Sequence, residues 1–241
     1  MIERLPLVAL TLRGLLDRKR TWLMLALAAV PVLLVGLAAG AGHRVVEAHN
    51  FNLLIVTTVL PLIALVFGTA ALGSELEEGT VVYLLTKPVR RSRIVVAKVS
   101  VAAGLTATLI FASSLATGLA ASLSGNDLVR AGTAFGVASA LGGVAYVALF
   151  LALSAFTTRA LAIGLAYVML WEGVLGGLLE GTRMLSVRQA TLALGREWAG
   201  LGPSREGLSY EQGLVILALF IVVAVSLATW RLSRYQLRGG D

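Results

Sequence analysis

Few side chains in this sequence could carry out chemistry on a bound molecule. The chain of 241 residues has no cysteine and only two histidines, His43 and His49. A tetrahedral metal site needs a set of Cys, His or carboxylate ligands, and no such set surrounds either histidine. We therefore interpret both as loop residues and expect no metal site. The lack of cysteine also excludes a thiol nucleophile and a disulfide framework.

The lysines argue against nucleotide hydrolysis by this chain. A P-loop places lysine directly after glycine and before Ser or Thr, but none of the three lysines, Lys19, Lys87 and Lys98, follows a glycine. The zinc-binding pattern H-E-x-x-H is also absent. We expect no enzymatic activity, no catalytic residues and no cofactor bound by this chain itself.

Glu172 is an acidic residue inside an apolar run, directly after Trp171. A charge at membrane depth costs about 2.5 to 3.5 kcal/mol on insertion scales, so it usually faces a bundle interior or a wet cavity. Two interpretations stay open. Glu172 and Trp171 line a translocation pathway, or the carboxylate has a structural role, near the outer interface or hydrogen-bonded to a neighbouring helix.

The densest ordered pattern of charges lies in residues 74–98, SELEEGTVVYLLTKPVRRSRIVVAK, between two apolar runs. Ser74 followed by Glu77 is a capping-box signal and predicts a short helix beginning near Glu75. Pro88 disfavours helical geometry in the residue before it and so ends this helix. Ser92 is a plausible cap for the next helix.

This segment resembles the E-x-G-T-x-x-x-L-L-x-x-P-x-x-R pattern of ABC-2 transporter permeases, through Glu78, Gly79, Thr80, Leu84, Leu85, Thr86, Pro88, Arg91, Ile94 and Lys98. The resemblance implies a cytoplasmic coupling helix that docks on a separate ATPase subunit, which binds ATP and Mg. The alternative is an ordinary amphipathic loop between two membrane helices. The residues that the resemblance assigns to ATPase coupling are Glu77, Glu78, Gly79, Thr80, Tyr83, Leu84, Leu85, Lys87, Pro88, Arg90 and Arg91.

Composition predicts an all-α polytopic membrane protein. Hydrophobic residues make up 58% of the chain and charged residues 14%, so a bilayer is its natural solvent. We predict one domain over residues 1–241, with six spans at about 22–41, 51–72, 99–123, 133–156, 161–179 and 213–230. Residues 1–21 form a basic amphipathic helix at the membrane surface, which resembles the elbow helix of ABC-2 permeases. Residues 180–212 form an extracytoplasmic segment with short helices, as in that family.

Small residues mark surfaces where helices approach closely. Gly173, Gly177 and Gly181 repeat a G-x-x-x-G spacing in the fifth predicted span, which favours a close helix pair or a subunit interface. Gly132 and Gly136 repeat the same spacing in the fourth span, where we expect helix packing.

The distribution of basic residues predicts the orientation. Six spans place both termini on one side, and that side, with the 74–98 segment, carries fourteen Lys and Arg residues against six on the other. By the positive-inside rule both termini and this segment are cytoplasmic. The net charge of +7 is spread over helix ends, which argues against nucleic acid as a partner.

We therefore expect a permease subunit of an ABC-2 exporter in a bacterial or archaeal plasma membrane. Its expected partners are two copies of a cytoplasmic ATPase and a second permease, identical or related. The alternative is a membrane scaffold that recruits a different cytoplasmic partner. An intramembrane enzyme is disfavoured because the catalytic sets are missing. The sequence does not identify the cargo.

Overall fold

The computed structural model describes residues 11–12, 14–40, 54–77, 90–123, 128–175, 184–202 and 207–234. Within these ranges every regular element is a helix. The elements are α2 (Arg18–Gly40), η1 (Ile55–Val59), α4 (Leu60–Glu77), α6 (Arg91–Ser122), α7 (Val129–Phe156), α8 (Ala160–Ala166), η2 (Tyr167–Leu175), α10 (Val187–Ala199) and α11 (Tyr210–Ser233).

Five of these helical stretches are long and apolar enough to cross a membrane, by length and composition. They are Arg18–Gly40, Ile55–Gly73, Arg91–Ser122, Val129–Phe156 and Tyr210–Ser233, and each coincides with a predicted span. The fifth predicted span falls instead on a shorter apolar helix, Ala160–Gly173. The all-α polytopic fold is therefore confirmed, whereas the count of six spans stays a prediction.

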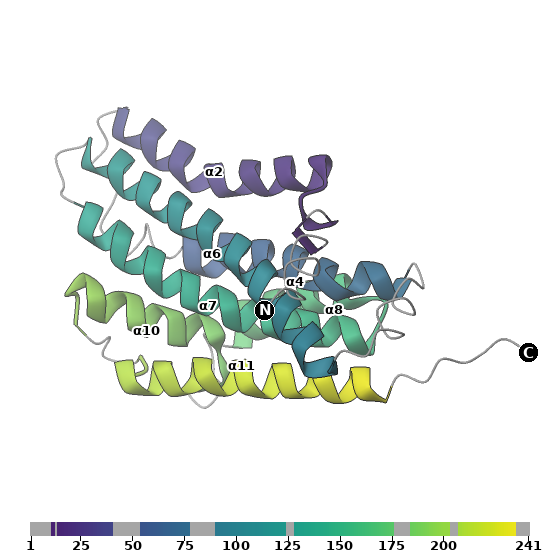
Figure 1. Cartoon of the computed structure of the whole chain (residues 1–241). Coiled ribbons are helices and arrows are strands. Elements are labelled where there is room, and N and C mark those ends of the chain that lie inside the picture. The colour runs from purple at the N-terminus through teal and green to yellow at the C-terminus, as the bar shows by residue number, and fades with distance from the viewer. Residues whose placement is uncertain are drawn as a thin grey trace, which may run out of the picture.

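Helix α7 lies at the centre of the bundle. It packs against α6, α4, α10 and α11, and its buried face is made mostly of alanine, glycine and serine. The apolar window of α2 and that of α11 are each only 22% buried, against 72% for residues 55–73 and 67% for α7. Helices α2 and α11 therefore form opposite edges of the bundle (Figure 1).

Glycines bring α6 and α7 into close contact, as the spacing of Gly132 and Gly136 predicts. A Cβ at Gly132 would lie 2.9 Å from the Ser114 carbonyl oxygen and 3.1 Å from the Gly118 Cα. The Ser114 hydroxyl donates a hydrogen bond to the Gly132 carbonyl oxygen at 2.8 Å. A side chain larger than hydrogen at Gly132 would force these two backbones apart.

The second span begins with a widened helical turn next to a proline. In η1 the Leu60 amide donates to the Ile55 carbonyl, an i to i−5 bond. Pro61 follows directly, has no amide hydrogen and crowds the carbonyl four residues earlier. A π-type turn moves that carbonyl aside and lets the helix continue through the proline.

The ends of the helices near residues 74–98 differ from the prediction. Helix α4 continues through Ser74 to Glu77, so the predicted helix start near Glu75 is wrong, because the apolar helix before it does not stop. Helix α6 begins at Arg91 with Arg90 as its N-cap, so Ser92 is not the cap. The long apolar helices thus extend into both flanks of the polar segment.

Most of the predicted N-terminal surface helix lies outside the described residues. Within 11–17, residues 16 and 17 are not helical, and α2 begins at Arg18. The basic run Arg18, Lys19 and Arg20 therefore forms the first turn of the first long helix. Leu15, just before it, is buried in the core.

Candidate functional site

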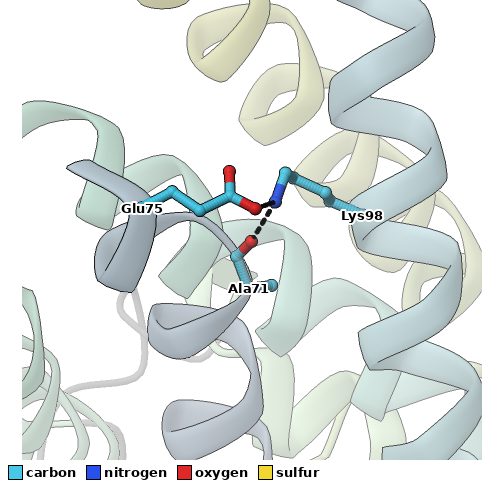
Figure 2. Close-up of polar contacts among 3 residues, drawn as sticks. All are labelled: Ala71, Glu75 and Lys98. Carbon is cyan, nitrogen blue, oxygen red and sulfur yellow. Dashed lines mark hydrogen bonds and ion pairs between the residues drawn. The ribbon is translucent and has the colours of Figure 1, made fainter. Parts of the chain in front are cut away.

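An ion pair joins the two helices that flank the polar segment. The Lys98 ammonium on α6 donates to Oε1 of Glu75 at 2.6 Å and to the Ala71 carbonyl oxygen at 2.6 Å, both on α4 (Figure 2). The Lys98 side chain is 3% exposed and that of Glu75 is 27% exposed. The pair is therefore buried on its cationic side and partly solvated on its anionic side.

The position of Lys98 follows from the cost of burying an ammonium. A buried charge is strongly disfavoured unless it is paired and hydrogen-bonded. Glu75 supplies the opposite charge, and the Ala71 carbonyl supplies a second acceptor near the negative end of the α4 dipole. We infer that this contact holds the end of α4 against the start of α6.

The predicted coupling residues lie mostly between these fixed helix ends. Glu77 is the last residue of α4, and Arg90 and Arg91 begin α6. Arg90 is exposed, and Arg91 is half-buried. The remaining coupling residues fall outside the described residues and stay a prediction: Glu78, Gly79, Thr80, Tyr83, Leu84, Leu85, Lys87 and Pro88.

A second polar cluster surrounds Glu172 in η2. Glu172 is 1% exposed, and its carboxylate accepts three hydrogen bonds. The donors are the Ser186 hydroxyl at 2.5 Å, the Val187 amide at 3.1 Å and the Tyr167 hydroxyl at 3.2 Å. Two of these donors belong to the start of α10, so Glu172 joins η2 to a helix that follows it in the chain.

Trp171 and Ser186 reinforce the same junction. The Trp171 indole donates to the Leu185 carbonyl oxygen at 3.1 Å. Ser186 is the N-cap of α10, and its hydroxyl oxygen accepts from the Gln189 amide at 3.1 Å. Trp171 and Glu172 of η2 thus form hydrogen bonds with Leu185, Ser186 and Val187 at the start of α10.

This junction lies inside the bundle. Two contacts show that α10 runs antiparallel to α7. The Thr191 side chain fills the space beside Gly142, and Gly195, one turn later in α10, faces the ring of Phe135, which comes earlier in α7. The start of α10 therefore lies near Tyr146, which is fully buried and close to Glu172. Tyr146 is ten residues from the end of α7 at Phe156, about 15 Å at 1.5 Å per residue.

The predicted glycine stripe of the fifth span is only partly described. Gly173 is exposed, and among the described residues a Cβ there would come within 4 Å of the Val168 carbonyl oxygen alone, at 3.6 Å. Gly177 and Gly181 lie outside the described residues. The described part of the stripe therefore has an open surface, and its role at an interface stays a prediction.

Sequence reasoning missed several partners in these clusters. The pairing of Lys98 with Glu75 and that of Glu172 with Ser186 join residues far apart in the chain, and no local spacing indicates either one. Tyr167 is the exception. It lies five residues before Glu172 in one apolar run, and a phenol near an intramembrane carboxylate is a recognisable signal.

Comparison with known proteins identifies the family. The family model described as ABC-2 family transporter protein matches residues 16–179. This range covers α2 through η2 and includes Glu75, Lys98 and Glu172. It ends before α10, which supplies Ser186 and Val187. A search of curated proteins found no match to the chain. Because the family model matches well over half of the chain, the chain belongs to the ABC-2 family of transporter membrane proteins.

Proposed function

We propose that this chain is the transmembrane permease subunit of an ABC-2 exporter, which forms the translocation pathway and couples it to ATP hydrolysis by a separate ATPase. The observation that carries the proposal is the family match over residues 16–179. The long apolar helices support a multi-pass membrane location.

The proposed topology has six spans and cytoplasmic termini. The five long helices supply five spans. The remaining span is the fifth in chain order. We propose that it consists of α8, η2 and the residues that follow, whose apolar sequence continues to about residue 179. An even number of spans places both termini on one side, and the excess of Lys and Arg near the termini and the polar segment favours the cytoplasm for that side.

The proposed coupling element is the polar segment around residues 78–90. Its support is the ion pair of Lys98 with Glu75, which holds the two flanking helices together. Because the two flanking helices are held together, a force that the ATPase applies to this segment would move α4 and α6. The residues proposed to contact the ATPase are Glu77, Glu78, Thr80, Tyr83, Leu84 and Leu85, with Lys87 and Arg90 to Arg93 at the lipid headgroups.

The proposed assembly contains two permeases and two ATPases. The ATPases bind ATP and Mg, and their closure pushes the coupling segments together, so that packed helices move as rigid bodies and alternate access to the pathway. The permeases pair through surfaces that include the fifth apolar helix, where the open surface at Gly173 supports a close helix contact. The second permease is an identical copy or a related chain.

Co-purification with an ABC ATPase tests the proposal. We expect the two proteins to form a stoichiometric complex in detergent, and we expect Glu78→Arg and Leu84→Arg to lower its ATPase rate. Arg130→Glu, at the opposite end of the bundle, is the matched control and should leave the rate unchanged.

Two outcomes would count against the proposal. A complex that hydrolyses ATP normally with both coupling substitutions would overturn the contact assignment. Stable recovery of a cytoplasmic partner that has no ATPase activity would overturn the permease function and favour the scaffold.

A further inference from the structure

We propose that Glu172 is a positioning residue that fixes the buried start of α10 to the fifth apolar helix, and that it is not a cargo ligand. The sequence leaves both roles open, since any carboxylate at membrane depth suggests a pathway. The three donors gathered on this carboxylate favour the positioning role. The anchoring rests on geometry alone, whereas its consequence for transport rests on the proposed function.

A helix that starts inside a membrane bundle has unpaired backbone amides. The first amides of any helix lack an intrahelical acceptor, and the hydrocarbon region offers no water to replace it. Here the Val187 amide donates to Glu172 and the Gln189 amide donates to Ser186. Glu172 and Ser186 together supply acceptors for the first turn of α10.

The charge of Glu172 suits this position. The N-terminal end of a helix carries a partial positive charge that stabilises a nearby carboxylate. The Ser186 and Tyr167 hydroxyls add two more donors, and hydrogen bonds to an ionised group are about twice as strong as neutral ones. Glu172 makes no ion pair within the described ranges, and these donors help to stabilise a charge at this depth.

On its other sides α10 contacts α7 and α11, whereas Glu172, together with Trp171, connects its start to η2. Helix α10 lies between α7 and α11 (Figure 1). It packs on α7 through Thr191 and Gly195, and on α11 where Leu194 lies against Gly213. The carboxylate therefore ties the fifth apolar helix to α10 and, through it, to α7 and α11. In an exporter, a movement of the fifth helix would carry the start of α10 with it.

Hydrogen exchange of the purified, cargo-free chain in detergent tests the anchor. In Glu172→Ala we expect peptides covering residues 186–190 to exchange about tenfold faster or more, because the Val187 amide loses its acceptor and the Ser186 hydroxyl that caps the helix loses the carboxylate that holds it. Glu172→Gln keeps one acceptor oxygen and should fall between Glu172→Ala and the native chain. Peptides from the middle of α7 should exchange at the native rate.

Two further variants keep the test decisive if Glu172→Ala does not fold. Tyr167→Phe removes one of the three donors and should raise exchange at residues 186–190 by a smaller factor. Glu211→Gln changes an exposed carboxylate in the first turn of α11 and should leave exchange at residues 186–190 unchanged.

A cargo ligand and an anchor differ in this experiment because no cargo is present. Unchanged exchange at residues 186–190 in Glu172→Gln and Tyr167→Phe would overturn the anchor, whatever the outcome of the ATPase co-purification. Faster exchange at those residues together with a failed co-purification would support the anchor and overturn only the permease function.

Discussion

The ion pair of Lys98 with Glu75 predicts an asymmetric response to mutation. Replacing Glu75 by leucine leaves an ammonium that is 3% exposed without its counter-charge, and stranding a buried charge costs about 3 kcal/mol or more. Replacing Lys98 by methionine keeps the length of the side chain and removes the ammonium from beside a carboxylate that is 27% exposed. Water can solvate that carboxylate, so we expect a loss of about 1 kcal/mol.

The double variant Lys98→Met with Glu75→Leu measures how strongly the two substitutions depend on each other. Neither charge remains to be stranded, so its loss should be about 1 kcal/mol, far below the sum of the two single losses. Equilibrium unfolding in mixed detergent micelles gives the free energy of unfolding of each variant. Lys19→Met, an exposed lysine on α2, is the control for the loss of a surface charge. Equal losses in the two single variants, or additive losses in the double variant, would refute the role assigned to burial.

Two further substitutions test how the helices pack. Gly132→Ala should lower the free energy of unfolding by about 1 to 3 kcal/mol, because its Cβ would lie 2.9 Å from the Ser114 carbonyl oxygen. Gly104→Ala is the control: no atom of the described residues lies within 4 Å of its Cβ, and it should show no loss in the same unfolding assay. Ser113→Ala removes a 2.6 Å hydrogen bond to the Ala28 carbonyl that joins α6 to α2, and we expect the free energy of unfolding to fall by about 1 kcal/mol. An unfolding curve identical to that of the native chain would show that this bond does not stabilise the bundle.

The sequence predicts the long helices well because each is an uninterrupted apolar run. In a bilayer such a run satisfies its backbone only as a helix, so the five long spans are readable without knowledge of their neighbours. Their ends are less predictable. The capping signal at Ser74 does not start a new helix, because α4 continues through Ser74 to Glu77. The apolar run at residues 160–175 includes a widened helical stretch, η2, which apolar composition alone does not predict.

The candidate site is less readable because its key contacts join residues distant in the sequence. Glu172 stands out as a charge in an apolar run, but its partner Ser186 lies in a stretch that reads as external loop. In the sequence Lys98 is one residue of the ABC-2 pattern, and only the packing of α6 on α4 shows that it is buried against Glu75. A sequence can thus indicate which side chain is costly to bury, whereas the fold determines what offsets that cost.

Labelling of a single cysteine at Tyr83 shows on which side of the membrane the coupling segment lies, because the natural chain has no cysteine that would react in the background. In intact cells, a membrane-impermeant maleimide should leave Tyr83→Cys unlabelled, and it should label this position once the membrane is opened. Labelling of Tyr83→Cys from outside intact cells would contradict a cytoplasmic coupling segment, and with it the proposed link to an ATPase.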